Sequence, residues 1–191
     1  MPNKLVLASG SPRRKELLNQ VNIPFSIRKH NFDETLIKTT NPEEKVKELA
    51  LHKGRAVTIK ANDEIILSAD TVVSYRDEIF EKPKNKEEAF EMISKLSGDI
   101  HEVYSGVMIR SKTQEVLLVE QTKVEFWSLS DAEIETYIST EDPYDKAGSY
   151  GIQSIGAMFV KQIIGDYYNV VGLPVSRVVR ELREFNISPK Y

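Results

Sequence analysis

The chain has 191 residues, of which 40% are hydrophobic, and its 26 Lys and Arg against 29 Asp and Glu residues give a net charge of −3. This size and hydrophobic content predict one domain over residues 1–191, with two lobes around a cleft, and argue against disorder. The lack of a basic excess argues against a nucleic-acid partner. Without cysteine and with three histidines, neither disulfides nor a His/Cys zinc site is expected.

The sequence also carries expectations about location and metal. The N-terminal apolar run is too short for a signal peptide. No stretch approaches the about 20 apolar residues that a membrane span needs, so we expect no membrane segment. The absence of cysteine suits a reducing cytoplasm. Any metal should be a hard divalent cation held by carboxylates and substrate phosphates.

The N-terminal segment predicts an anion-binding turn. A strand at residues 4–8 is followed by a small-residue turn and a helix that begins at Pro12, with Ser11 as N-cap. Free backbone N–H groups at such a helix start favour a negatively charged ligand. Arg13 and Arg14 are unfavourable for the helix dipole there, which indicates that an anion is supplied from outside. The alternative is an ordinary helix start with solvated arginines.

The next segment places a lysine on the inward face of a helix. A strand at residues 25–29 leads into a polar loop, residues 30–40, in which Glu34 belongs to an acidic pair. Such a pair is either solvated surface or a carboxylate carried over a cleft. Asn41 then caps a helix in which Lys53 falls on the apolar stripe. A lysine at that position either snorkels to solvent or points into a polar cleft.

An acidic residue stands in the middle of a predicted buried strand. Residues 65–75 are mostly apolar and β-branched, with Asp70 among them. A carboxylate at such a position is costly unless something pairs with it. It is either a satisfied structural residue at a strand end or a catalytic carboxylate that faces a cleft on a rigid strand.

The remainder of the chain predicts a mixed α/β fold. Pro83 holds Lys82 in an extended conformation and so aims its side chain. The Gly-rich residues 142–156 either line a ligand site or form a plain connection. Further expected elements are a helix between a cap at residue 85 and a stop at 98, strands over 101–110 and 115–127, a helix over 130–139, a strand over 157–164, a turn over 165–169 and a helix from 174 to 185. This pattern favours a long curved mixed sheet, helices around it and a central cleft between two lobes.

At this point the sequence resembles the Maf family of nucleotide pyrophosphatases. The motifs occur in the family's order and cover nearly the whole chain; each is weak alone, but together they are specific. They are Leu7-Ala8-Ser9-Gly10-Ser11-Pro12-Arg13-Arg14, Asp33-Glu34, Ala69-Asp70-Thr71-Val72-Val73, Lys82-Pro83, Leu96-Ser97-Gly98, His101, Lys146-Ala147-Gly148, Tyr150-Gly151-Ile152-Gln153, Gly165-Asp166-Tyr167 and Asn169-Val170-Val171-Gly172-Leu173-Pro174. The resemblance implies a Maf/ITPase-like α/β fold and a cytoplasmic, often dimeric enzyme. It also implies divalent-metal-dependent cleavage of nucleoside triphosphates to monophosphate and pyrophosphate.

The resemblance further implies roles for individual residues. The family's general base carries over to Asp70, and contacts to nucleotide and metal carry over to Ser9, Arg13, Glu34, Lys53, Lys82 and Gln153. We expect Arg14 to contribute to phosphate binding with its turn, and Asp70 and Glu34 to hold Mg²⁺ or Mn²⁺. The base and metal-ligand roles of Asp70 cannot be separated from sequence. The chain departs from the usual family pattern at Gly54, where alanine is usual, and at Glu81, where glycine is usual.

The branch of the family depends on three positions, which here are Arg13, Thr71 and Gln153. This combination resembles the branch that acts on dTTP and UTP, and the 7-methyl-GTP branch differs at all three. Arg13 carries only donors, which suits a uracil or thymine carbonyl rather than the cytosine amino group. Two alternatives stay open: a non-catalytic nucleotide-binding regulator of cell division, and a purine pyrophosphatase of the inosine-triphosphate type.

Overall fold

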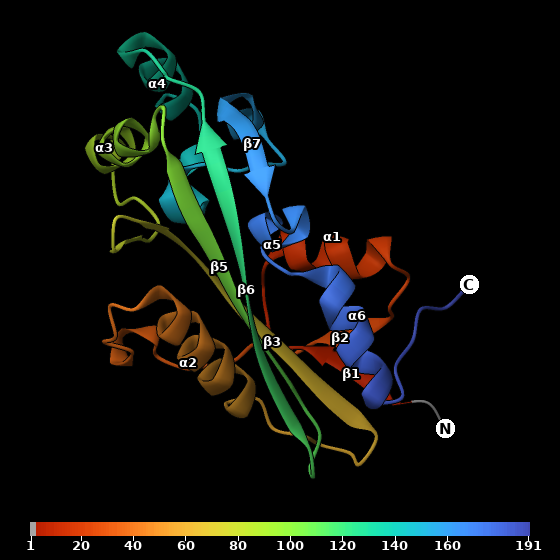
Figure 1. Cartoon of the computed structure of the whole chain (residues 1–191). Helices are drawn as coiled ribbons and strands as arrows, with labels where there is room; N and C mark the ends of the chain where they lie inside the picture. Colours follow the sequence, from red (N-terminus) through yellow and green to blue (C-terminus); the bar gives the residue numbers. More distant parts are fainter. Residues whose placement is uncertain (1–2) are drawn as a thin grey trace.

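The computed structural model of the protein describes residues 3–191, which form a seven-stranded mixed sheet with helices on both sides (Figure 1). The strands are β1 (Lys4–Leu7), β2 (Phe25–Ile27), β3 (Glu64–Tyr75), β4 (Glu78–Phe80), β5 (Ile100–Arg110), β6 (Glu115–Phe126) and β7 (Val160–Ile164). The helices are α1 (Pro12–Gln20), α2 (Pro42–Arg55), α3 (Lys86–Leu96), α4 (Asp131–Ile138), α5 (Tyr167–Val171) and α6 (Val175–Glu184). The predicted α/β class with a mixed sheet is confirmed.

The strand order is β2-β1-β3-β5-β6-β7, with β4 paired to β3. Strands β2, β1 and β3 are parallel, whereas β3, β5, β6 and β7 pair antiparallel. The long strands β3, β5 and β6 cross the whole molecule in Figure 1, with α1 and α6 near one end and α3 and α4 near the other. The sheet is therefore a continuous frame that joins two hydrophobic cores.

Strand pairing along one edge of β3 is interrupted at the centre of the molecule. On one edge β3 pairs with β5 continuously, from Ile66 to Ser74. On the other edge β1 pairs only as far as Leu67, and β4 begins only at Val73. Residues 68–72 have no strand partner on that edge within the described part of the chain. Backbone groups there must find other partners or water, so the interruption opens the sheet to a ligand.

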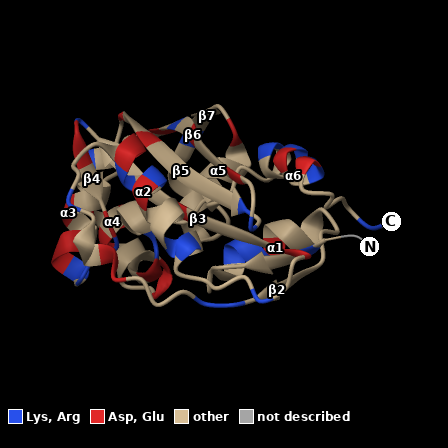
Figure 2. Ribbon diagram, turned by 90° about the horizontal axis from the view of Figure 1, so that it is seen from below, with Lys and Arg blue, Asp and Glu red and all other residues tan. Residues whose placement is uncertain are grey.

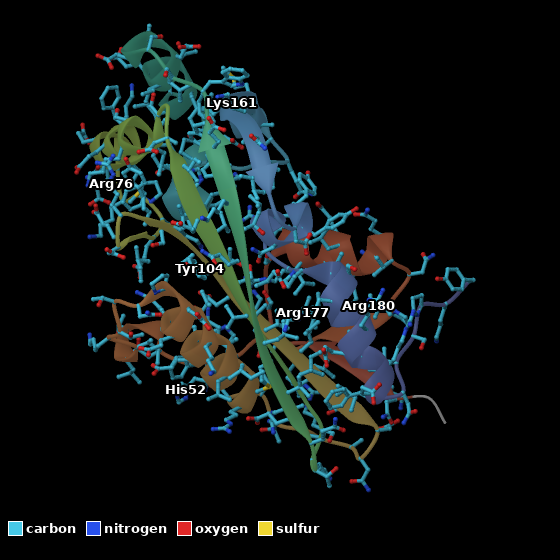
Figure 3. The ribbon with its side chains drawn as sticks, viewed as in Figure 1. His52, Arg76, Tyr104, Lys161, Arg177 and Arg180 are labelled. Carbon is cyan, nitrogen blue, oxygen red and sulfur yellow. The ribbon has the colours of Figure 1, made fainter. Side chains whose placement is uncertain are left out.

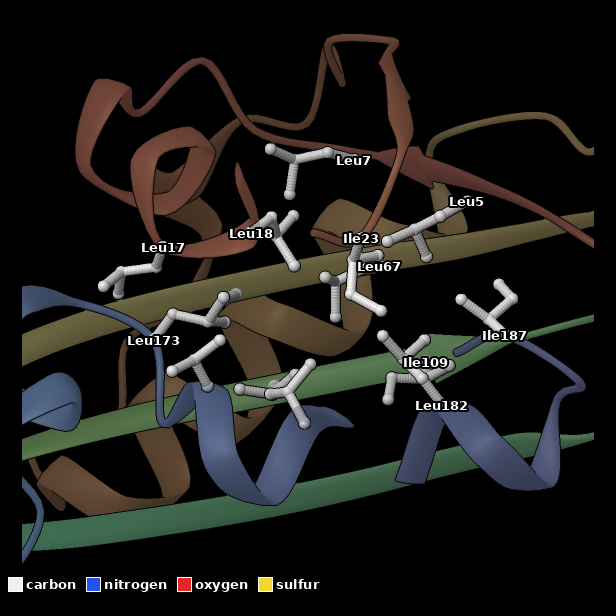
Figure 4. Close-up of a cluster of buried hydrophobic side chains, with 14 of the residues drawn as sticks. Leu5, Leu7, Leu17, Leu18, Ile23, Leu67, Ile109, Leu173, Leu182 and Ile187 are labelled. Carbon is white, nitrogen blue, oxygen red and sulfur yellow. The ribbon is translucent and has the colours of Figure 1, made fainter. Parts of the chain in front are cut away.

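Alternation along β3 directs neighbouring side chains to opposite faces of the sheet. Leu67 belongs to the core that α1 and α6 cover, whereas the Oγ of Ser68 donates a hydrogen bond to the Ala50 carbonyl of α2 at 2.6 Å. By the same alternation Asp70 lies on the α2 face and Thr71 on the opposite face. Figure 4 shows the core on the α1 and α6 side, where Leu17, Leu18 and Leu182 pack with residues of β1 and β3.

Most of the helix starts are stabilised by capping hydrogen bonds between residues a few positions apart. The side chains of Asn41 and Asn85 accept hydrogen bonds from the N–H groups of Glu44 and Glu88, which confirms both predicted caps. Ser130 forms a capping box with Glu133 at the start of α4. Ser11 is the exception, because its side chain makes no capping bond. The Oγ of Ser9 instead accepts from the Ser11 N–H at 3.2 Å.

Two predicted elements are wrong in part, and one strand was missed. The strand predicted over residues 157–164 begins only at Val160, because Ile155–Phe159 forms a 3₁₀ helix that brings Gly156 against the backbone of Gly151. The turn predicted over residues 165–169 contains the start of α5, whose first N–H groups are capped by the Asp166 side chain. Strand β4 was not predicted. None of the helices within residues 3–191 is both long and apolar enough to cross a bilayer.

A glycine sets the distance between α2 and the sheet. Gly106 of β5 lies opposite Asp70 in the β3–β5 pairing, and a Cβ atom there would collide with the Val46 carbonyl of α2. We therefore expect Gly106→Ala to lower the free energy of unfolding by about 1–3 kcal/mol through overpacking. Gly10→Ala is the control, because its Cβ would meet only the Lys29 Cε at 3.6 Å, an ordinary contact. Urea unfolding measures both, and equal midpoints for Gly106→Ala and wild type would contradict this packing.

A buried histidine packs in the second hydrophobic core, which lies at the end of the sheet covered by α3 and α4. His101 Nε2 lies 2.8 Å from the hydroxyl of Tyr150, and both rings pack edge-to-face on Phe126. Burial lowers the pKa of His101 to about 3, against a weaker opposing effect of Asp99. Burial also raises the pKa of Tyr150. The pair is therefore neutral, and it ties the segment around Tyr150 to β5.

The low pKa of His101 predicts acid sensitivity. An unfolded histidine binds a proton below about pH 6.5 while the folded one does not, so stability falls as the pH drops from about 6.5 toward 3. Between pH 7 and 5 we expect wild type to lose on the order of 2 kcal/mol more than His101→Gln, which keeps a polar contact but does not titrate. Urea titrations at both pH values measure the difference, with His52→Gln as the exposed control. Parallel pH profiles for wild type and His101→Gln would rule this out.

Candidate functional site

A cleft of about 1050 Å³ opens where the edge of β3 is interrupted. Seven Lys or Arg and four Asp or Glu residues line it, so it carries a local positive excess in a chain whose net charge is −3. Figure 2 shows the start of α1 in blue for its basic residues, close to β3. All nine residues expected at the site line this cleft: Ser9, Arg13, Arg14, Glu34, Lys53, Asp70, Thr71, Lys82 and Gln153.

A buried ion-paired group lies on the α2 side of the cleft. The Nζ of Lys53 is 2.5 Å from Asp70 Oδ1 and 2.9 Å from Glu34 Oε2. The side chains of Lys53 and Asp70 are 7% and 14% exposed, whereas that of Glu34 is 52% exposed. Lys53 shares the buried face of α2 with Leu49 and Ala50, as its place on the apolar stripe predicted. One ammonium thus brings together carboxylates from β3 and from the loop before α2.

The two acids of the loop have different surroundings. The Oδ1 of Asp33 accepts hydrogen bonds from the N–H and the hydroxyl of Thr35 and so caps the 3₁₀ helix Glu34–Leu36. These bonds lower the pKa of Asp33. Asp33 therefore stabilises the loop, whereas its neighbour Glu34 lines the cleft.

Arg14 anchors the opposite wall. Its Nε donates to the Gly172 carbonyl at 2.8 Å, Nη1 to Ser9 Oγ at 3.1 Å and Nη2 to Thr71 Oγ1 at 3.2 Å. Burial lowers the pKa of Arg14, and the charge of Asp70 opposes that shift. Thr71 also lies 2.7 Å from Ser105 Oγ. The guanidinium therefore orders Ser9 and Thr71 while it presents positive charge to the cleft.

Arg13 and Gln153 stand at the end of the cleft formed by residues 142–154. The Nη1 of Arg13 lies 3.2 Å from Asp145 Oδ2, and Lys146 Nζ lies 2.6 Å from the other oxygen of that carboxylate. Burial acts to raise the pKa of Asp145, but the hydrogen bonds and charges of Lys146 and Arg13 together outweigh it and lower that pKa. Gln153 is exposed, and within residues 3–191 its side chain makes no hydrogen bond. Its amide is therefore available to a ligand.

Lys82 lies on the exposed rim of the cleft and has no ion-pair partner in the described part of the chain. The neighbouring Glu81, one of the two departures from the family pattern, pairs instead with Lys45 of α2 at 2.5 Å. Its negative charge is thus partly compensated. The second departure, Gly54, lies so close to Ser68 and Met108 that a Cβ atom would collide with their side chains.

The lining residues that were not singled out from the sequence include His30, Lys38, Lys45, Asp145 and Lys146. Lys146 belongs to the Lys146-Ala147-Gly148 motif of the family resemblance, so its position near the site could have been predicted from the sequence. Lys45 and Asp145 depend on contacts between distant segments. His30 had one signal, its place at the end of a parallel strand, where sheets of this kind bind ligands.

The charged groups allow two kinds of chemistry. Asp70 has a second carboxylate oxygen for which no protein partner is recorded in residues 3–191, so it can accept a proton or bind a cation. No group of three or more His, Cys, Asp or Glu side chains in these residues is placed to hold a metal ion. Two carboxylates that converge on one ammonium suit a cation that takes its other ligands from water and phosphate.

Known proteins are similar to this chain over almost its whole length. The family model described as Maf-like protein matches residues 4–185. Proteins named dTTP/UTP pyrophosphatase from Bacillus cereus (strain G9842) and Bacillus anthracis (strain CDC 684 / NRRL 3495) are each 52% identical to this chain over 184 residues, which is 96% of both chains. A further dTTP/UTP pyrophosphatase, from Bacillus cereus (strain ATCC 14579), is 51% identical over the same share. The chain therefore belongs to the Maf family.

Proposed function

We propose that the protein hydrolyses dTTP and UTP to the nucleoside monophosphate and pyrophosphate. The observation that carries the proposal is the ion-paired group of Lys53, Asp70 and Glu34 inside a cleft rich in positive charge. The names of relatives that are 52% identical over 96% of the chain support the substrates. A cleft that only bound nucleotide would need the cations, but not a buried carboxylate on a rigid strand.

The reaction needs water to attack the α-phosphorus while pyrophosphate leaves. Asp70 takes the proton from the attacking water, and its place on β3, paired along the β5 edge, fixes the direction from which that water approaches. Lys53, Lys82 and Arg14 neutralise charge on the phosphate oxygens, together with the backbone N–H groups of the turn before α1. Arg14 keeps Ser9 in place through the 3.1 Å hydrogen bond. Every group in this scheme lines the same cleft.

A divalent cation, Mg²⁺ or Mn²⁺, completes the proposal. The donor set fits, because Asp70 and Glu34 both contact one Lys53 ammonium and such cations use one or two carboxylates with phosphate and water as remaining ligands. These two carboxylates would hold the ion. When bound, it supplies charge neutralisation at the phosphate oxygens and favours loss of the water proton.

Base selection is assigned to the other end of the cleft. Arg13 is a pure donor, and its contact with Asp145 limits the positions from which it donates to a pyrimidine carbonyl. Gln153 offers an acceptor for the imide N–H and donors for a carbonyl. Thr71, the third position on which the family branch depends, is held in place by Arg14 and Ser105.

We also infer the wider setting from the sequence. The sheet is continuous between the two cores, which supports a single domain over residues 1–191. A cytoplasmic location, a homodimer and the absence of a nucleic-acid partner stay predictions. Gel filtration with light scattering measures the oligomeric state directly.

We expect Asp70→Asn to fold like wild type and to lose about 10²–10⁴-fold in kcat, because the substitution is nearly isosteric but removes the base. Pyrophosphate release from UTP measures the loss, and circular dichroism checks the fold. Glu81→Gln is the control, since it removes a carboxylate of the same cleft that has no role in the chemistry; its kcat should stay within about threefold. Wild-type turnover by Asp70→Asn would refute the assignment.

Activity should depend on a divalent cation. We expect excess chelator to abolish pyrophosphate release, and Mg²⁺ or Mn²⁺ added beyond the chelator to restore it, because a divalent cation would neutralise phosphate charge and favour loss of the water proton together. A dialysed enzyme assayed with and without EDTA provides the measurement. Full activity in excess chelator would show that the cations of the cleft suffice.

We expect UTP and dTTP to be good substrates and CTP, ITP and 7-methyl-GTP to be poor ones. A buried polar contact left unpaired by the wrong base gives on the order of 10⁴-fold rejection, whereas one methyl group changes kcat/KM by only about 10–100-fold. UTP should therefore exceed CTP by much more than UTP and dTTP differ. A preference for CTP, ITP or 7-methyl-GTP would refute the base assignment and leave the pyrophosphatase chemistry standing.

A further inference from the structure

His30 lies in the row of residues that builds the site. In the parallel part of the sheet Leu7 is opposite both Ile27 and Leu67. Three positions further along each chain segment lie Gly10, His30 and Asp70. Gly10 and His30 follow the carboxyl ends of β1 and β2, and Asp70 lies where the pairing of β3 is interrupted. Ligands of open α/β sheets bind at such strand ends. His30 lines the cleft beside the turn that carries Ser9.

The two nitrogens of the His30 ring differ in their surroundings. Nδ1 is buried and has no hydrogen-bond partner. No described residue bonds Nε2 either, but it is not among the fully buried polar atoms, so it reaches the solvent of the cleft. A proton on Nδ1 would be a donor left unpaired away from water, at a cost of about 1–3 kcal/mol. The tautomer with the proton on Nε2 is therefore favoured, and it directs a donor into the cleft.

Burial is the main reason why the His30 ring is neutral. Burial lowers its pKa, and Lys53 and Arg14 lower it further, while Glu34 and Asp70 act in the opposite direction. A neutral imidazole is a hydrogen-bond donor that adds no charge and needs no counter-ion. Its neighbours are the groups assigned to the phosphates rather than Arg13 and Gln153, which are assigned to the base.

We propose that the Nε2–H of His30 donates a hydrogen bond to a phosphate oxygen of the bound triphosphate. The ligand chemistry is that of a condensed phosphate, and the assignment rests on the proposed function only in taking the substrate to be a nucleoside triphosphate. No hydrogen bond within residues 3–191 draws Nε2 away from the cleft, so its donor is available to the ligand.

Binding of inorganic tripolyphosphate by calorimetry tests this without turnover or a base. His30→Leu removes the donor, whereas His30→Gln keeps an amide donor near the position of Nε2. The control is His52→Leu, because His52 stacks on Phe32 of the same loop at 5.0 Å but is exposed outside the cleft. Figure 3 shows His52 on the side of α2 that faces away from the long strands.

We expect His30→Leu to weaken tripolyphosphate binding roughly tenfold or more, as for loss of a hydrogen bond to a charged group. His30→Gln and His52→Leu should stay within about threefold of wild type. If His30→Leu does not fold, His30→Asn replaces it, since its shorter amide does not reach the Nε2 position and should bind more weakly than His30→Gln. Wild-type binding by His30→Leu, equal binding by the Asn and Gln variants, or an equal loss in His52→Leu would overturn the proposal. UTP hydrolysis by the wild-type protein is scored separately, so a failed function and a failed His30 assignment are distinguishable.

Discussion

The contact on which the structure of the site depends is the buried ammonium of Lys53 between Asp70 and Glu34. Taking charges out of water is costly, and the attraction between them compensates only where their geometry is held closely. Here β3 holds Asp70, α2 holds Lys53, and the loop capped by Asp33 carries Glu34. Loss of Lys53 would leave two carboxylates without their shared counter-charge, whereas loss of either carboxylate leaves Lys53 paired with the other. The three segments are therefore coupled in stability as well as in chemistry.

The second constraint is the interruption along the edge of β3. Strand pairing on the β5 side keeps β3 rigid, while the missing partner on the other side leaves residues 69–72 lining the cleft. Because successive side chains of a strand point to opposite faces, the side chains of Asp70 and Thr71 lie on opposite faces of the sheet at the same place along β3. This arrangement places the group assigned to phosphate chemistry next to a residue assigned to base selection. Gly106 allows α2 to approach closely enough for Lys53 to reach Asp70.

What the sequence predicted well is what short segments determine. The caps at Asn41, Asn85 and Ser130 and the inward position of Lys53 follow from residues within a few positions. The strand predicted over residues 157–164 was wrong at its start, since the close approach of Gly156 to Gly151 is a tertiary contact. For the same reason the pairing of Arg13 with Asp145, 132 positions apart, was not predictable. The resemblance to a family supplied the site residues, but not the reasons for their placement.

In the proposed reaction water attacks the α-phosphorus, next to the carboxylate of Asp70. Hydrolysis of UTP in ¹⁸O-labelled water, followed by mass spectrometry of the products, tests this point of attack most directly. We expect one labelled oxygen in UMP and none in pyrophosphate. Label in pyrophosphate, or release of labelled orthophosphate as the first product, would show attack at another phosphorus and would contradict the assigned geometry.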